Sequence, residues 1–183
     1  MAKFEIEHRG LLHEKQRKQL VQFMEINGKL VKKYERSQWI FGLSHDKKID
    51  LRIKETNGNK EFSLKVGKLD NSNRKEISIP FSESTVKEAM EFLKYLGHRE
   101  GLKAIRNASI YQYKDIEWAI VEVPDHSWYF EAEKLVDSKA AGKQALEEIE
   151  SIAEELGLKI FSPKETLAYI KTLDEEANKI FKL

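Results

Sequence analysis

The feature that most constrains this chain is a strict two-residue alternation of apolar and charged side chains in several short segments. In the run Leu51-Arg52-Ile53-Lys54, apolar and basic residues alternate without a break. The same alternation recurs in the segments 5–9, 62–66, 76–79 and 130–133. Because successive side chains of a β-strand point to opposite faces, each segment predicts a strand with one apolar and one charged face.

The rest of the sequence completes an α+β pattern of about eight antiparallel strands with a few helices. The turn signal Asn57-Gly58 predicts a hairpin, and Ser84 and Gly97 are expected to begin and end a helix. Ser162-Pro163-Lys164-Glu165 predicts the start of a last helix that continues through Ile180. Strands are expected at 3–9, 30–43, 49–55, 61–68, 75–81, 102–113, 116–123 and 128–135, and the other helices at 12–26 and 139–156. No linker composition or repeat interrupts the chain, so a single domain over residues 1–183 is expected.

Composition excludes several classes of protein. The chain has no cysteine, which rules out a disulfide scaffold, a zinc ribbon and a cysteine nucleophile. No window approaches ~18 consecutive apolar residues, so no membrane-spanning helix is expected. The N-terminal residues Met1 to Glu5 lack the apolar region of a secretory signal. A cytoplasmic protein that does not enter a membrane is therefore the expectation.

Charge is distributed unevenly along the chain, although the formal net charge is only +1. Residues 1–60 carry 14 Lys and Arg against 8 Asp and Glu, whereas residues 121–183 carry 8 against 14. A basic first third could bind an anionic ligand. Attraction between the basic and acidic parts of the chain explains the same distribution equally well. Asp46 and Asp50, which flank two lysines, predict a solvated turn.

Two of the alternating segments carry paired carboxylates. Glu5 and Glu7 are two residues apart, as are Glu131 and Glu133. Each pair lies on one strand face with its Cβ atoms about 7 Å apart, and like charges at that distance repel unless a cation lies between them. Carboxylate oxygens suit Mg²⁺ or Mn²⁺, which also accept phosphate oxygens as ligands. The alternative is an ordinary charged face exposed to water.

Basic residues occupy the middle strands in the same alternating fashion. Arg52, Lys54 and Lys65 are spaced to share a strand face, and their side chains suit phosphate oxygens. A closed barrel would explain both features, because its charged faces would line the interior and its apolar faces would meet helices outside.

The residues that carry these charges resemble a known superfamily. Glu5-Ile6-Glu7-His8-Arg9 resembles the N-terminal Glu-x-Glu-x-Lys signature of the CYTH superfamily, the triphosphate tunnel metalloenzymes. This superfamily includes class IV adenylyl cyclases, thiamine triphosphatases and inorganic triphosphatases. Further segments resemble its motifs in the same order along the chain: Leu51-Arg52-Ile53-Lys54, Ser63-Leu64-Lys65, Lys75-Glu76-Ile77, Tyr95-Leu96-Gly97 and Tyr129-Phe130-Glu131-Ala132-Glu133.

The resemblance implies an eight-stranded antiparallel β-barrel, or tunnel, with helices packed outside and the triphosphate inside. By the same resemblance, Mg²⁺ or Mn²⁺ is expected as cofactor, and three sets of site residues follow. The metal candidates are Glu5, Glu7, Glu131 and Glu133. The phosphate-binding candidates are Arg9, Arg52, Lys54, Lys65 and Arg106, and the catalytic candidates are Glu5, Glu7 and Arg9.

The chain also departs from the family pattern. Arg9 stands where the family has lysine, and unlike lysine it cannot exchange a proton. The family's Lys-x-Arg strand is replaced by Ala104-Ile105-Arg106, with Lys103 one step out of phase. The metal-binding aspartate before the final strand falls near Ala119, and Glu117 lies two residues earlier on the same face. These departures bear on catalysis more than on fold.

The expected function is metal-dependent chemistry on a triphosphate group. Hydrolysis of tripolyphosphate or of a nucleoside or thiamine triphosphate fits as well as a class IV adenylyl cyclase reaction. The alternative is a non-catalytic module of the same fold that binds a polyphosphate or nucleotide. A third reading, an RNA-binding protein, rests on the basic first third alone. The expected partner is a triphosphate-containing small molecule, without a membrane or nucleic acid, and both monomer and homodimer remain open.

Overall fold

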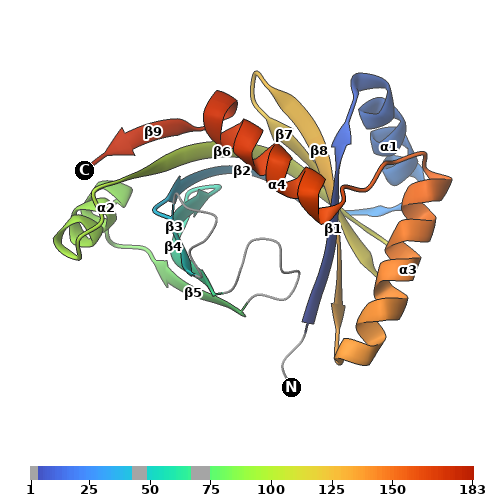
Figure 1. Cartoon of the computed structure of the whole chain (residues 1–183), viewed down its shortest axis with the longest axis horizontal. Coiled ribbons are helices and arrows are strands. Elements are labelled where there is room, and N and C mark those ends of the chain that lie inside the picture. The colour runs from blue at the N-terminus through green and yellow to red at the C-terminus, as the bar shows by residue number, and fades with distance from the viewer. Residues whose placement is uncertain (1–3, 43–48, 67–74) are drawn as a thin grey trace. The chain divides into compact units, whose positions relative to one another are not determined.

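A computed structural model describes residues 4–42, 49–66 and 75–183 of the chain, and its strands and four α-helices confirm the α+β class (Figure 1). The side chains of Phe4, Glu5, Lys75, Glu76 and Lys139 lie outside this description. Contacts between Cα atoms divide the chain into two compact units. Unit 1 comprises Met1–Lys33 and Asn107–Tyr169, and unit 2 comprises Tyr34–Arg106 and Ile170–Leu183. The single domain predicted over residues 1–183 stays a prediction.

Unit 1 contains the strands β1 (Phe4–Leu12), β8 (Ser127–Val136), β7 (Ile116–Val123) and the last part of β6 (Glu100–Tyr113), paired in that order. All these pairings are antiparallel. The sequence predicts that β1 ends near Gly10, but the strand continues to Leu12. A Cβ at Gly10 would lie only 2.0 Å from the carbonyl oxygen of Lys159. Glycine at this position therefore permits a close backbone approach, and it does not end the strand.

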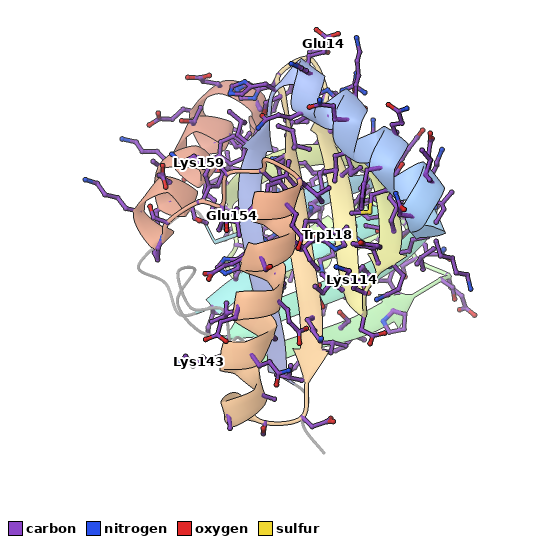
Figure 2. The ribbon with its side chains drawn as sticks, turned by 90° about the vertical axis from the view of Figure 1, so that its right-hand side faces the viewer. Glu14, Lys114, Trp118, Lys143, Glu154 and Lys159 are labelled. Carbon is purple, nitrogen blue, oxygen red and sulfur yellow. The ribbon has the colours of Figure 1, made fainter. Side chains whose placement is uncertain are left out.

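Helices α1 (Glu14–Asn27) and α3 (Lys139–Glu155) contribute the core of unit 1 together with the apolar strand face. The core includes Leu20 and Met24 of α1, Ile149 of α3, and the stacked rings of Trp118 and Phe130. Trp118, labelled in Figure 2, is fully buried. Full burial of an apolar side chain stabilises the fold by about 1.5–3 kcal/mol. The alternating pattern of these strands thus places their apolar residues against helices, as predicted.

Unit 2 contains the paired strands β2 (Lys29–Ile40, from Tyr34 onwards), β3 (Ile49–Thr56), β4 (Asn59–Val66) and β5 (Lys75–Phe81). Asn57 and Gly58 join β3 and β4 with φ angles of 48° and 81°, which confirms the predicted hairpin turn. Helix α2 (Val86–Tyr95) packs against the apolar face of β3. Its N-cap is Thr85, one residue after the predicted Ser84, because Thr85 and Glu88 form the capping box.

The C-terminal segment differs from the prediction of one long helix. Helix α4 (Pro163–Thr172) begins as predicted, and a π-helical turn, Leu173–Ala177, follows it. The chain then forms strand β9 (Lys179–Lys182), which pairs antiparallel with the first residues of β6. Asn178 is extended, and its N–H donates to the carbonyl of Leu173 at 2.8 Å. Pairing with β6 therefore overrides the helical spacing at Ile180.

Two further expectations concern the whole chain. Closure of the strands into an eight-stranded tunnel is not among the pairings of the described residues, so it stays a prediction. Within the described part of the chain, no helix is both long enough and apolar enough to span a membrane.

Candidate functional site

The acidic candidates of unit 1 share one face of the β1, β8 and β7 strands. In the strand register, Glu7 lies opposite Glu133, and Arg9 lies opposite Glu131. Directly paired residues of antiparallel strands have Cβ atoms about 4.5–5.5 Å apart, so the four side chains form one cluster. Glu5 belongs to β1 and is paired with Leu135, but its side chain lies outside the described residues.

Arg9 bridges two of the predicted metal-site carboxylates. Its Nε lies 2.9 Å from Oε1 of Glu131 and also donates to Oε1 of Glu7. Burial by itself would lower the pKa of Arg9, but the carboxylates of Glu131 and Glu7 outweigh that effect and raise it. Arg9 is therefore a permanent cation in the acidic cluster, and its role in chemistry is restricted to electrostatics and hydrogen bonding.

The donor chemistry of this cluster fits a hard divalent cation. Glu7, Glu131 and Glu133 offer only oxygen ligands, the type that Mg²⁺ and Mn²⁺ prefer. Among the described residues, no group of three or more His, Asp or Glu side chains is arranged as a metal centre. Mg²⁺ commonly uses one or two carboxylates, with water and substrate phosphates completing its shell. The cluster is thus compatible with an ion that the substrate helps to bind.

Strand β7 contains the position at which the family pattern has a metal-binding aspartate and this chain has Ala119. Ala119 lies opposite Glu131, and Glu117 lies opposite Glu133. The two β7 positions therefore share the face of the acidic cluster, and Ala119 contributes no oxygen in the row that contains Arg9. Glu117 is displaced by two residues, about 6.5–7 Å along the strand.

The basic candidates of unit 2 lie on a strand face that is largely buried. Arg52 and Lys54 share this face of β3 with Asp50, and Ser63 and Lys65 lie opposite on β4. Asp50 and Lys54 are each only 8% exposed, and Ser63 is fully buried. On the opposite, apolar face, Ile79 of β5 is 60% exposed. An ordinary charged face exposed to water does not explain this arrangement.

Arg52 is held by two partners that the sequence analysis did not assign to the site. Its Nε and Nη2 donate to the two carboxylate oxygens of Asp50 at 2.8 and 2.6 Å. Its Nη1 donates to Oε1 of Gln38 at 2.8 Å. The prediction that Asp50 belongs to a solvated turn is therefore wrong, because Asp50 is a buried member of strand β3. The signal that could have found it is its position two residues before Arg52, on the same strand face. Asp46 lies outside the described residues.

The remaining basic candidates also have partners within unit 2. Lys54 Nζ lies 3.6 Å from Oε1 of Glu61, and Lys65 lies opposite Asp50 in the register. Arg106 is buried and donates to Oδ1 of Asn178 at 3.0 Å and to the carbonyl of Ile105. Each cation is thus fixed in position by neighbouring acceptors.

Lys103, which the sequence places one step out of phase with Arg106, has a different partner. Its Nζ lies 5.3 Å from the ring centroid of Trp39, a cation–π contact. Arg106 therefore lacks the neighbouring lysine of the family pattern.

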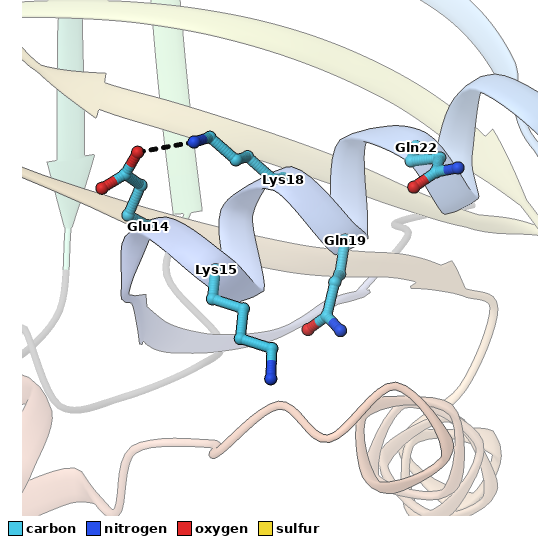
Figure 3. Close-up of a pocket in the computed structure, with 5 residues that line it drawn as sticks. All are labelled: Glu14, Lys15, Lys18, Gln19 and Gln22. Carbon is cyan, nitrogen blue, oxygen red and sulfur yellow. Dashed lines mark hydrogen bonds and ion pairs between the residues drawn. The ribbon is translucent and has the colours of Figure 1, made fainter.

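A shallow surface depression of about 430 Å³ lies along α1, apart from these candidates (Figure 3). Its lining side chains are all polar and exposed, and Glu14 and Lys18 form an ion pair at 2.7 Å across one turn. Exposed pairs of this kind contribute little to stability, because water and salt screen their attraction. Nothing in the depression adds to the candidate site. Its lining residues are Glu14, Lys15, Lys18, Gln19 and Gln22.

Comparison with known proteins identifies the fold. No protein-family model matches the sequence, and no curated protein is significantly similar to it. Among solved structures, the PH1819 protein from Pyrococcus horikoshii is 23% identical, with a TM-score of 0.69, covering 91% of this chain and 99% of that one. A candidate adenylate cyclase from Vibrio parahaemolyticus is 15% identical, with a TM-score of 0.69, covering 92% and 99%.

A third similar structure adds a described activity. It is a candidate adenylyl cyclase from Hippeastrum, described as having a dominant triphosphatase activity. It is 15% identical, with a TM-score of 0.55, covering 87% of this chain and 90% of that one. These likenesses show that the chain shares its fold with structures described as candidate adenylate cyclases, which agrees with the fold that the sequence resemblance implies. At these identities the likeness is one of fold.

Proposed function

We propose that this chain binds the triphosphate group of a small molecule and acts on it with Mg²⁺ or Mn²⁺. The observation that carries the proposal is the largely buried polar face of β3 and β4 in unit 2, which holds Arg52, Lys54 and Lys65 together with Asp50 and Ser63. The partners Asp50, Gln38 and Glu61 hold the donor groups of Arg52 and Lys54 in place, where they suit phosphate oxygens. Two similar structures are described as a candidate adenylate cyclase and as a candidate adenylyl cyclase with a dominant triphosphatase activity, which is consistent with this chemistry.

The residues divide into two roles. Glu7, Glu131 and Glu133, with Glu5, would hold the ion, which when bound would supply positive charge to the phosphates. Arg52, Lys54, Lys65 and Arg106 would bind phosphate oxygens through charge-assisted hydrogen bonds. Arg9 would add a fixed positive charge without exchanging a proton, since its pKa is raised. In both hydrolysis and cyclisation, the protein mainly positions the phosphates and neutralises their charge.

A panel of triphosphates tests the proposal and separates the two reactions. Tripolyphosphate, ATP and thiamine triphosphate are each incubated with Mg²⁺ or Mn²⁺, and products are quantified. Orthophosphate release identifies a hydrolase, and pyrophosphate with a cyclic nucleotide identifies a cyclase. Absence of both turnover and binding for every compound contradicts the proposal.

The matched control for the panel removes one buried ion pair as a unit. The double variant Asp50→Ala/Arg52→Ala removes both members of the ion pair, and such paired replacements are less disruptive than the loss of one member alone. It should lose triphosphate binding while remaining folded. Retained binding would remove Arg52 from the proposed phosphate site.

A second candidate function is a non-catalytic module that binds a polyphosphate or nucleotide. It is favoured by Ala119, which offers no carboxylate opposite Glu131, and by Arg9, which pairs with two of the expected metal ligands. Tight binding of the panel compounds without turnover, measured by calorimetry, would select this function over the enzyme.

A further inference from the structure

We propose that Asp50 is a resident carboxylate that holds the phosphate-binding fork of Arg52 and limits the affinity of this site for phosphate. The inference rests on the proposed function and assigns a specificity-determining role to a residue outside the candidate set. Both carboxylate oxygens of Asp50 accept from Arg52, at 2.8 and 2.6 Å. Two parallel N–H···O bonds are also the geometry by which arginine binds phosphate.

The number of available donors makes Asp50 and a phosphate competitors. A guanidinium group has five N–H donors. Asp50 takes two of them along one edge, and Gln38 takes a third. A phosphate must therefore approach the remaining donors beside a carboxylate or take the fork that Asp50 now occupies.

The environment of Asp50 strengthens this competition. Asp50 is 8% exposed, so water screens its charge only weakly. A phosphate oxygen near Arg52 would be repelled by this charge, and a ligand with several negative charges gains most from the other cations of the same face. Asp50 should therefore weaken binding of every phosphate and disfavour orthophosphate most.

Strand β4 provides a second cation for the displaced carboxylate. Lys65 lies directly opposite Asp50 in the register, at a distance that allows the two side chains to pair. When a phosphate takes the Arg52 fork, Asp50 can keep a cationic partner on the neighbouring strand. The exchange moves a side chain and needs no change in strand pairing.

The test measures tripolyphosphate binding by calorimetry at a fixed Mg²⁺ concentration. Asp50→Asn keeps the side-chain shape and one acceptor oxygen but removes the charge. Its affinity for tripolyphosphate should rise about tenfold, the effect expected of one weakly screened unit charge removed from beside the ligand. Circular dichroism establishes that each variant is folded.

The matched control is Glu55→Gln, which changes the net charge equally on the same strand. Glu55 lies on the opposite face of β3, where by alternation it does not face Arg52. Its affinity should match that of the wild type. An equal rise in both variants would mean that net charge alone is responsible, and would overturn the inference.

A double variant tests whether the gain in tripolyphosphate affinity depends on Arg52. The gain from Asp50→Asn should vanish when Arg52→Gln is present, because the fork is then absent. If the wild type binds tripolyphosphate and Asp50→Asn binds it equally or more weakly, the inference about Asp50 is overturned and the proposed function stands. No binding by either protein overturns the proposed function and the inference together, whereas binding by Asp50→Asn alone supports both.

Discussion

At the scale of single residues, Arg9 is the most informative difference from the motif that the sequence resembles. Its Nε faces both Oε1 of Glu7 and Oε1 of Glu131, so one donor of the guanidinium serves two carboxylates. A lysine ammonium is a compact point charge on a flexible stem and holds two separate carboxylates less firmly. A divalent ion would therefore have to share these carboxylates with Arg9 or displace Arg9 from them.

Arg9→Lys should raise the affinity for Mn²⁺ while lowering thermal stability. The lysine would bind the two carboxylates less firmly and leave them more accessible to the ion. Loss of one charge-assisted hydrogen bond lowers the free energy of unfolding by about 1.5–3 kcal/mol at most. Mn²⁺ binding is measured by electron paramagnetic resonance, and stability by thermal unfolding. Weaker Mn²⁺ binding by a folded Arg9→Lys variant would show that Arg9 does not compete with the ion.

At the scale of an element, strand β7 controls how many carboxylates the acidic face can offer. Ala119→Asp would place a second carboxylate in the row of Arg9 and Glu131. The variant should increase Mn²⁺ affinity and activity on at least one triphosphate, measured by calorimetry and phosphate release. Glu117→Ala, the control on the same face, should change both quantities little. The opposite pattern would identify Glu117 as the ligand.

Helix α4 supplies a prediction about pH through its capping box. The Lys159 ammonium and then the Ser162 backbone N–H and hydroxyl lower the pKa of Glu165 from 4.5 to about 2. The lowered pKa means that the charged cap stabilises the helix fully above about pH 4.5. This contribution is lost as pH falls from 4.5 through 2.

Glu165→Gln should therefore reduce the pH dependence of stability between pH 4.5 and 2. Thermal unfolding of both proteins at a series of pH values measures the difference. The two melting temperatures should converge at the acidic end of the series. A constant difference at all pH values would mean that the side-chain charge does not stabilise the cap.

At the scale of the whole molecule, the candidate metal ligands and most of the candidate phosphate-binding residues belong to different units. The described acidic cluster belongs to unit 1, and the basic face of β3 and β4 belongs to unit 2. The predicted tunnel requires Glu7, Arg52, Lys65 and Glu133 to line one cavity. Mn²⁺ bound to the acidic cluster should then broaden the amide resonances of β3 once tripolyphosphate is added. Broadening confined to β1 and β8 would contradict a shared cavity.

The sequence by itself determined strands β1 to β8, most helix positions and the strand face of most charged candidate residues. It could do so because a period of two residues fixes which side chains share a strand face. The Asn57-Gly58 hairpin follows from equally local chemistry, since its backbone angles favour these two residues. The ordered motifs were also sufficient to predict the fold that similar structures support.

Only the tertiary structure decided which partners the charged residues have and which of them are buried. Alternation cannot tell that Gln38 reaches Arg52, because that contact depends on the pairing of β2 with β3. It also cannot show that Asp50 is buried, since burial depends on residues distant in sequence. Strand β9 shows the same limit for a whole element. Its residues follow a helical spacing, but hydrogen bonds to β6 outweigh that local preference.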